Sequence, residues 1–236
     1  MKIERVSTGI PGLDELMEGG IPRGAAVLVT GVPGCAKTTF GLQFIVKGAM
    51  ESGEKGVFIS LEEKITQLAR QFMIYGYDIL KMQEEGKILL IHPEINIEEG
   101  EDLLKKITGD DFMGKITEFG ARMVAIDPLN LVTQFSGGYG GERRSVERLI
   151  HAYKKLDCTT LFTHERACGG EDITYGVQDF VVDGIIYLQL IRREVPFENR
   201  MAFFDRKLSI LKMRETDHGQ GFYPLRIEKD GIHIYQ

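Results

Sequence analysis

Short apolar runs alternate with amphipathic stretches along the first two thirds of the chain. The apolar runs predict buried strands at residues 25–29, 56–60, 87–91, 123–127 and 159–163. The helical periodicity between them predicts long helices at about 37–51, 64–75, 103–116 and 142–156. The third of these is broken near Gly109 and is open to being two pieces, and a shorter helix is expected at 12–17. Strands that alternate with helices are typical of a parallel sheet.

The pattern changes after Asp183. Extended runs follow one another there without helices between them, at 185–192, 207–214, 222–227 and 231–235. We therefore expect an α/β fold with a mostly parallel central sheet and antiparallel C-terminal strands. The glycine-bearing segments 137–141 and 168–176 are expected to be loops, the first of them flexible. Since no linker, repeat or low-complexity tract divides the sequence, residues 1–236 are expected to form one domain.

A glycine-rich turn joins the first long strand to the helix after it. Residues 31–38 read Gly-Val-Pro-Gly-Cys-Ala-Lys-Thr, close to the P-loop pattern G-x-x-x-x-G-K-[ST]. In a P-loop, backbone N–H groups curl around an anion and the helix start adds partial positive charge. Lys37 would reach the β- and γ-phosphates of ATP, and the Thr38 hydroxyl would bind Mg²⁺. The expected nucleotide-binding residues are Gly31, Val32, Pro33, Gly34, Cys35, Ala36, Lys37, Thr38 and Thr39.

Ala36 departs from the pattern, which has glycine at this position. At a negative φ the alanine costs little, whereas at a positive φ, or in close contact with phosphate, its methyl group would weaken the loop. The sequence leaves both possibilities open. Cys35, inside the same loop, could be an oxidation switch, but a small and passive side chain is the more common role.

Polar residues also end other predicted strands, where an open parallel sheet binds ligands. Asp127 ends the fourth strand, as a magnesium-holding aspartate does, although Asp-Pro also favours turns. Glu62 and Glu63 follow the second strand and could activate the water that attacks the γ-phosphorus, with Glu62 preferred. They could equally begin the next helix. Thr163-His164-Glu165, at the end of the fifth strand, could sense the γ-phosphate and relay its presence to the loop that follows, but a lone histidine is more often structural or exposed.

Composition limits the class of protein. A chain of 236 residues that is 43% hydrophobic can bury one sizeable core. Its net charge of −6 gives no overall attraction to nucleic acid or to anionic membranes. The three cysteines lack C-x-x-C spacing, so neither a disulfide framework nor a zinc site is expected. Neither a signal peptide nor a membrane-spanning run is recognisable, so we expect a cytoplasmic protein without a membrane partner.

One helix carries a basic face, which could contact DNA or a protein partner. A solvated helix face is the more common explanation. The flanking loops lack the interleaved aromatic and basic residues of a single-strand-binding groove, since Tyr139 stands alone. DNA binding is therefore possible but not favoured. The residues of this face are Arg143, Arg144, Arg148, Lys154 and Lys155.

With these residues in place, the chain resembles the KaiC-like branch of the RecA superfamily of P-loop ATPases over nearly its whole length. Archaeal RadA paralogues share this single-domain outline. The P-loop, the Glu62-Glu63 pair and Asp127 carry part of the resemblance. The rest lies in Ser-Thr-Gly-Ile-Pro-Gly-Leu-Asp at 7–14, Gly-Gly-Ile-Pro at 19–22, Thr-His-Glu-Arg at 163–166, the segment 175–183, and Lys-Met-Arg-Glu-Thr-Asp-His at 212–218.

The resemblance implies a RecA-like core that assembles into a homo-oligomer, a hexameric ring with ATP between subunits. It implies that Lys212 and Arg214 reach the ATP of the neighbouring copy, that His218 lies near the sugar, and that Glu62 is the catalytic glutamate. Lys212 and Arg214 are two residues apart on a predicted strand, so they should face the same side and act like an arginine finger. The alternative is a pair of edge-protecting cations. Since Asp179-Phe180 stand where phosphorylating domains carry adjacent Ser and Thr, autophosphorylation is not expected there.

The expected function is slow, Mg²⁺-dependent hydrolysis of ATP at subunit interfaces. The expected catalytic residues are Lys37, Glu62, Glu63, Lys212 and Arg214, and the expected metal ligands are Thr38 and Asp127. Two alternatives stay open. One is a nucleotide-gated assembly or regulatory module with little turnover that recruits a protein partner, which Ala36 favours. The other is a RadA-paralogue-like accessory ATPase in DNA recombination or repair.

Overall fold

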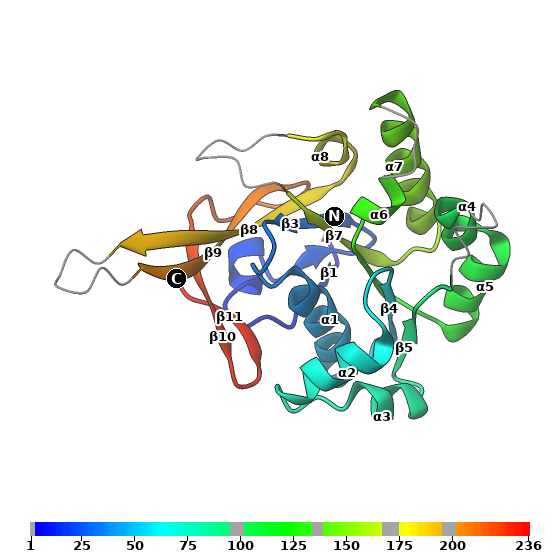
Figure 1. The fold of residues 1–236 in the computed structure, drawn as a ribbon, viewed down its shortest axis with the longest axis horizontal. Helices are drawn as coiled ribbons and strands as arrows, with labels where there is room; N and C mark the ends of the chain where they lie inside the picture. The colour runs from blue at the N-terminus through cyan, green and yellow to red at the C-terminus, as the bar shows by residue number, and fades with distance from the viewer. Residues whose placement is uncertain (1–2, 95–101, 134–138, 167–174, 195–201) are drawn as a thin grey trace.

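A twisted sheet runs through the molecule (Figure 1). The computed structural model describes residues 3–94, 102–133, 139–166, 175–194 and 202–236. The described strands of the sheet lie in the order β11 (Gly231–Ile234), β10 (Tyr223–Glu228), β9 (Ala202–Met213), β8 (Gly184–Glu194), β3 (Ala26–Gly31), β7 (Thr159–Glu165), β6 (Met123–Asp127), β4 (Gly56–Ser60) and β5 (Ile88–Ile91). From β8 to β5 the strands are parallel, whereas β9, β10 and β11 run antiparallel to their neighbours. The predicted sheet architecture is confirmed.

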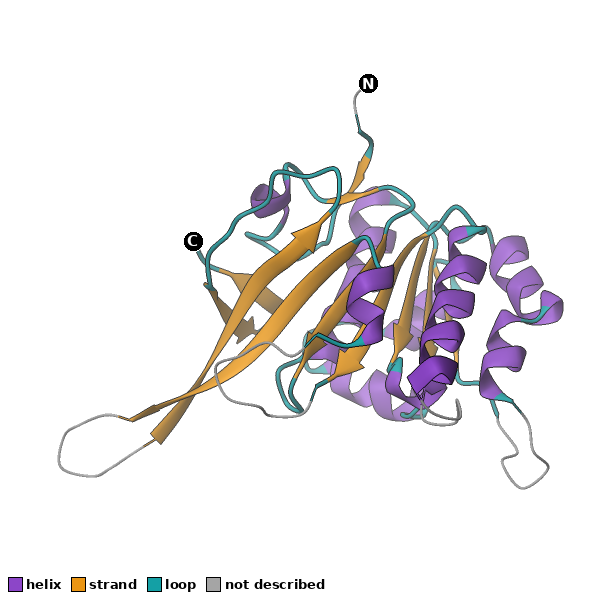
Figure 2. Ribbon diagram, turned by 90° about the horizontal axis from the view of Figure 1, so that it is seen from above, coloured by secondary structure: helices purple, strands orange, loops and turns teal. Residues whose placement is uncertain are grey.

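Helices cover both faces of this sheet (Figure 2). The first face is covered by α1 (Lys37–Lys47), α2 (Ile65–Met73) and α3 (Ile79–Glu84), and the second by α4 (Leu103–Thr108), α5 (Asp110–Phe119) and α7 (Tyr139–Lys154). Strand β3 lies between these layers, with Val27 and Val29 in one core cluster and Ala26 and Leu28 in the other. A strand buried on both faces reads as a continuous apolar run, which is why β3 was recognisable.

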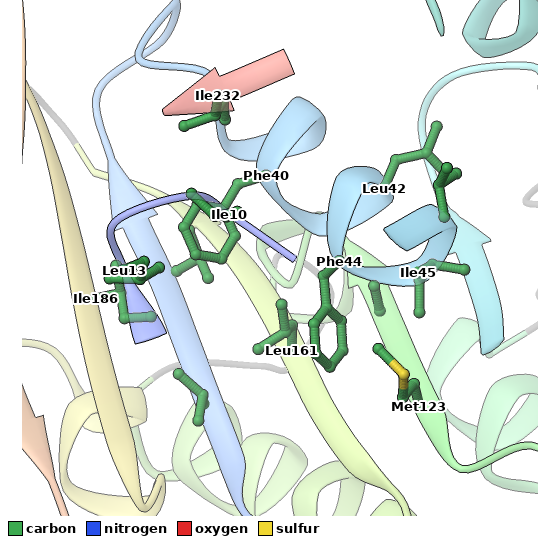
Figure 3. Close-up of a cluster of buried hydrophobic side chains, with 14 of the residues drawn as sticks. Ile10, Leu13, Phe40, Leu42, Phe44, Ile45, Met123, Leu161, Ile186 and Ile232 are labelled. Atoms are coloured by element: carbon green, nitrogen blue, oxygen red, sulfur yellow. The ribbon is translucent and has the colours of Figure 1, made fainter. Parts of the chain in front are cut away.

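The α1 helix is fastened to the sheet by aromatic side chains one helical turn apart. Phe40 and Phe44 are both fully buried, and they lie on the same side of the helix because they are four residues apart. Phe40 points toward Ile10, and Phe44 toward Leu161 of β7 (Figure 3). This packing holds the helix that follows the glycine-rich turn against the centre of the sheet.

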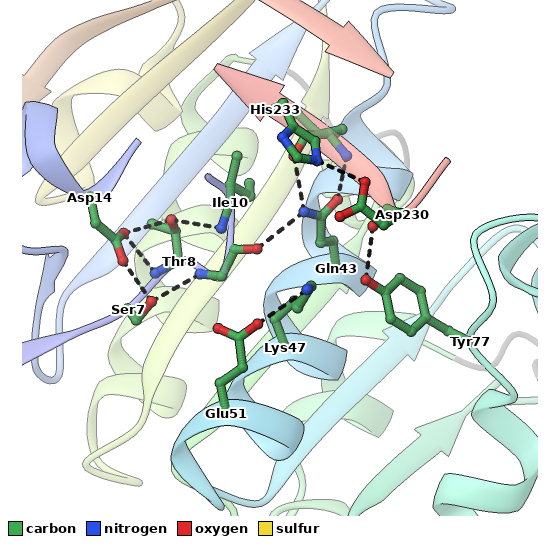
Figure 4. A network of polar contacts seen from close by, with 12 residues as sticks. Ser7, Thr8, Ile10, Asp14, Gln43, Lys47, Glu51, Tyr77, Asp230 and His233 are labelled. Carbon is green, nitrogen blue, oxygen red and sulfur yellow. Dashed lines mark hydrogen bonds and ion pairs between the residues drawn. The ribbon is translucent and has the colours of Figure 1, made fainter. Parts of the chain in front are cut away.

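A buried glutamine on α1 joins the two ends of the chain (Figure 4). The Gln43 side-chain amide donates to the carbonyl oxygens of Gly9 and Ile232, at 3.1 Å each. Its oxygen accepts from the Ile232 N–H at 2.6 Å. Close by, the Asp14 carboxylate accepts hydrogen bonds from both Ser7 and Thr8. The Ser-Thr-Gly segment therefore holds the N-terminal region against α1 and β11.

Replacing Gln43 with leucine is expected to lower the free energy of unfolding by about 3 kcal/mol, because three buried backbone groups lose their partner. Denaturant unfolding would measure the change. Gln67→Leu on the exposed side of α2 is the matched control and should change stability by no more than about 0.5 kcal/mol. Equal effects of the two substitutions would show that the hydrogen bonds of Gln43 contribute little.

Several predicted boundaries were close, and some elements were missed. The break at Gly109 does divide the predicted helix, into α4 and α5. The helix predicted at 37–51 is α1 followed by a π-helical turn, and the one predicted at 12–17 is a 3₁₀ turn at Asp14–Met17. The elements not predicted are the short helices α3, α6 (Asn130–Thr133) and α8 (Val177–Val181), and the paired strands β1 (Arg5–Val6) and β2 (Ile21–Pro22).

The flexible loop predicted at 137–141 is wrong for its last three residues. Helix α7 begins at Tyr139 and takes in both following glycines, whereas 137 and 138 lie outside the described residues. The side chains of Val146, Leu149 and Tyr153 are buried in the core, and this tertiary packing outweighs the poor helix propensity of glycine. Of the loop predicted at 168–176, only the last two residues are described. None of the described helices is long and apolar enough to cross a membrane.

Candidate functional site

The turn between β3 and α1 has the backbone of an anion-binding loop. Gly34 has a φ of 79°, and the position that a Cβ atom would take there faces open space. Helix α1 starts at Lys37 with no side-chain cap on its first N–H groups. Uncapped N–H groups at a helix start, together with the helix dipole, favour negative charge. The residues predicted to hold phosphate, 31–39, therefore lie in a geometry suited to it.

Ala36 occupies the left-handed region, with φ 81° and ψ 30°. Of the two possibilities that the sequence left open for Ala36, the backbone therefore has the positive φ. Its methyl group packs against the core cluster on the α1 side of the sheet. The departure from glycine thus strains the loop by about 1–2 kcal/mol but directs the added carbon toward the protein core.

Replacing Ala36 with glycine is expected to raise the free energy of unfolding by about 0.5–1 kcal/mol, because relief of the left-handed strain exceeds the greater chain entropy of glycine. Denaturant unfolding would measure it. The matched control is Ala152→Gly in the last turn of α7, which should instead lower stability by about 0.5–1 kcal/mol. Loss of stability in both variants would contradict the strain at Ala36.

Two further side chains of the loop define its chemistry. The Lys37 ammonium donates to the carbonyl of Val32 at 2.9 Å, so it lies over the loop. Cys35 is fully buried, and burial raises the pKa of its thiol, which the Lys37 charge opposes only in part. A buried thiol held in its protonated form is a poor nucleophile, which favours the passive role for Cys35.

Asp127 and Thr38 meet at the end of β6. The Thr38 hydroxyl donates to the Asp127 carboxylate at 2.9 Å, and Thr163 of β7 donates to its other oxygen. The carboxylate is 5% exposed, and burial raises its pKa, although the hydrogen bonds from Thr163 and Thr38 oppose the shift. A hydroxyl and a carboxylate side by side are the hard oxygen ligands that Mg²⁺ takes alongside phosphates and water. These two residues fit such an ion.

The two glutamates lie beside this pair, in the turn between β4 and α2. Ser60, the last residue of β4, is paired with Asp127 across the sheet. Glu63 accepts a hydrogen bond from Gln71 at 2.7 Å, and its charge is among those that raise the pKa of Asp127 after burial. Glu62 is exposed. Helix α2 begins only at Ile65, after Lys64 as its cap residue, so neither glutamate lies in the helix.

His164 lies next to the P-loop strand and is neutral. Its Nδ1 atom is 3.3 Å from the Thr30 hydroxyl, and its Nε2 atom is 3.3 Å from the Gln178 amide. Burial, with the charges of Arg166 and Lys37, lowers the pKa of His164 to about 4. The histidine therefore forms a hydrogen-bonded bridge from β3 toward α8.

Arg214 lies at the opposite end of the parallel strands from the loop, and Lys212 lies two residues before it, paired with Ile185 of β8. Arg214 pairs with Asp183 at 3.1 Å, and Asp183 accepts from the backbone N–H of Ala26, the first residue of β3. The loop starts at Gly31, five residues further along the strand and about 17 Å away at 3.3 Å per residue. Arg214 is thus remote from the loop of its own chain. It follows the last residue of β9, so its predicted place on the strand is wrong by one residue.

The segment that carries His218 is held at this same end by the N-terminal region. Arg5 donates to the Thr216 hydroxyl at 2.8 Å and to the carbonyl of Glu215 at 3.0 Å. His218 itself lies 3.1 Å from the carbonyl of Gly219. Among the described residues, none of Lys212, Arg214 and His218 contacts the loop, the glutamates or Asp127.

Two arginines near the loop were missed by the sequence. Arg206 of β9 donates from two nitrogens to the carbonyl of Gly34, at 3.2 Å each. Arg166, just after β7, donates to the Thr30 hydroxyl at 2.8 Å. No local pattern marks Arg206, because only the pairing of β9 with β8 brings it to the loop. Arg166 does belong to the quoted Thr-His-Glu-Arg string, but its partners could not be read from it.

The chain is similar to known proteins over nearly its whole length. The model of a family described as "ATPase: KaiC" matches residues 6–236. The circadian clock oscillator protein KaiC of Synechococcus elongatus is 34% identical over 239 residues, which cover 99% of this chain and 44% of that protein. That of a Nostoc species is 32% identical over 238 residues, with 99% and 44% covered. The chain thus spans less than half the length of these relatives.

A solved structure is similar over its whole length. The KaiC-like protein of the hyperthermophilic archaeon Pyrococcus horikoshii OT3 is 35% identical, and the alignment covers all of both chains with a TM-score of 0.82.

Proposed function

Because the chain belongs to the KaiC family of P-loop ATPases, we propose that it binds ATP with Mg²⁺ at its P-loop and hydrolyses it slowly at interfaces between its own copies. The observation that carries the proposal is the contact between Thr38 and Asp127 beside an uncapped helix start. This arrangement combines an anion site with oxygen ligands for a divalent cation, which is what a nucleoside triphosphate with Mg²⁺ requires.

Each residue of the site has a role in this proposal. The backbone of 31–36 and the start of α1 hold the phosphates, while Lys37 leaves the Val32 carbonyl to bind the β- and γ-oxygens. Bound between Thr38 and Asp127, Mg²⁺ would neutralise charge that develops on the phosphates. Glu62 takes the proton of the attacking water, and Glu63 holds the turn through Gln71.

The far placement of Lys212 and Arg214 supports assembly. Arg214 is about 17 Å from the loop of its own chain, so it could act only on the loop of another copy, and Lys212 lies two residues before it. Supplied in this way, they stabilise charge on the transferred phosphoryl group in the transition state. A protomer alone lacks them, so its turnover should be slow. A closed ring is the arrangement in which every loop receives such a pair, and we propose a hexamer.

Binding and turnover test the proposal on one sample. Calorimetry with ATP and with ADP, phosphate release, and size measurement in each nucleotide should give tight binding, slow magnesium-dependent release and a ring-sized species. Ala36→Gly should bind as the parent does, since the methyl group faces the core. A chain that binds no nucleotide would contradict the proposal.

A nucleotide-gated assembly module is the second candidate, and the left-handed strain at Ala36 is the observation that favours it. It predicts a change of size with nucleotide but no sustained phosphate release. DNA binding has less support, because two cations of the basic α7 face are paired with carboxylates. Arg143 contacts Glu147 at 2.8 Å and Lys154 contacts Asp183 at 2.6 Å.

A further inference from the structure

Arg166 connects the end of the P-loop strand to helix α8. Its side chain donates to the Thr30 hydroxyl at 2.8 Å, and its backbone N–H donates to the carbonyl of Gly31 at 3.1 Å. The same guanidinium pairs with the carboxylate of Asp179. The Arg166 side chain is 10% exposed and that of Asp179 is 1% exposed. An ion pair this well buried holds its two segments in one arrangement, because separating it leaves an uncompensated charge.

Helix α8 in turn holds Lys212. The second carboxylate oxygen of Asp179 accepts the Gly176 N–H at 2.6 Å, at the start of the helix. The backbone carbonyls of Asp179 and Val182 accept from the Lys212 ammonium, at 3.2 and 2.5 Å. An ammonium group has three donors, so one is left for a further acceptor. Asp179 thus contacts Arg166 with its side chain and Lys212 with its backbone.

A second, uncharged bridge runs beside the first. His164 is neutral, and both of its hydrogen bonds are satisfied if Nδ1–H donates to Thr30 while Nε2 accepts from Gln178. Gln178 and Asp179 are adjacent on α8, and both bridges start from the Thr30 hydroxyl. The position of α8 relative to β3 is therefore specified by two bridges that share the Thr30 hydroxyl.

We infer that Asp179 and Arg166 are positioning residues for Lys212. They fix α8, and with it the Lys212 ammonium, relative to the strand that carries the chain's own P-loop. The inference rests on the proposed action of Lys212 on a neighbouring copy. A copy then presents Lys212 correctly to its neighbour only while its own Thr30–Arg166–Asp179 connection is intact.

The test mixes two variants of the full chain that are each nearly inactive. The acceptor, Arg214→Ala, keeps its loop and glutamates. The donor, Glu62→Gln/Glu63→Gln, keeps its cations but cannot activate water. The mixture should regain phosphate release at acceptor loops that face donor cations. Adding Asp179→Asn to the donor should lower the regained rate about tenfold through misplacement of Lys212. The same substitution in the acceptor should leave the rate unchanged, a difference that a purely structural role would not produce.

Three comparisons complete the design. Glu118→Gln in the donor removes an exposed carboxylate of α5 and should change nothing. Lys212→Met in the donor sets the lowest rate expected. If Asp179→Asn does not assemble, the donor Arg166→Gln/Asp179→Asn, which leaves no buried charge unpaired, takes its place.

The outcomes separate the two proposals. A donor with Asp179→Asn that supports the full rate, or an equal loss with the substitution in the acceptor, would overturn the positioning role alone. If the acceptor mixed with the donor that keeps Asp179 regains no activity, the cations do not act between copies, and both proposals fail.

Discussion

Replacing Arg214 with alanine is expected to lower ATP turnover by roughly a thousandfold and to leave ATP affinity nearly unchanged. The side chain is 58% exposed at the far end of the sheet, so its removal leaves the chain's own loop intact. Asp183 keeps Lys154 as a partner, so no buried charge is left alone. A cation that acts only on the transition state changes the catalytic rate rather than binding. Phosphate release at saturating ATP and calorimetry would measure the two quantities.

Two controls accompany this variant. Arg226→Ala removes another exposed cation, on β10, and should leave turnover as it is. Arg214→Lys keeps the charge but not the planar group and should fall between the parent and the alanine variant. Full turnover in Arg214→Ala would contradict the action between copies, and a loss of ATP affinity would place Arg214 in the binding site instead.

The second large effect is expected at Glu62. Glu62→Gln should lower turnover by about 10²–10⁴-fold, because the amide cannot take the proton of the attacking water. Glu63→Gln should lower it less, because an amide at this position can still accept the hydrogen bond of Gln71. Both variants should bind ATP and assemble as the parent does. Single-turnover phosphate release compared between them would measure the difference.

The comparison also has a clear contrary result. A greater loss in Glu63→Gln would assign the base to Glu63, whose charge already raises the pKa of Asp127 together with burial. Glu51→Gln, on an exposed turn after α1, is the matched carboxylate control. Equal turnover in all three variants would contradict a carboxylate base in this turn.

Much of the core of the fold could be predicted from local pattern. Strand β6 was predicted with its observed ends, because a fully buried run that ends in an aspartate has sharp boundaries. The division of the helix near Gly109 into two pieces was also foreseen as a possibility. Short helices such as α3 and α8 were not predicted, because five or six residues make too few turns for a periodicity to be recognised. That residues 1–236 form one domain stays a prediction, as do the roles of the site residues.

The sequence by itself determined that this protein has a P-loop between a buried strand and a helix, an aspartate at the end of a neighbouring strand, and an α/β sheet with an antiparallel end. Each of these follows from residues close together in the chain, where periodicity and turn chemistry act. Only the tertiary structure decided that Ala36 is left-handed with its methyl group toward the core, and that Arg214 lies at the end of the strands remote from the loop.

The connection from Thr30 through Arg166 to Asp179 likewise belongs to the tertiary structure alone. Thr30 and Arg166 are 136 residues apart and meet because β3 pairs with β7 in one register. Pairing of distant strands is set by burial of both sheet faces, which no local window of sequence contains.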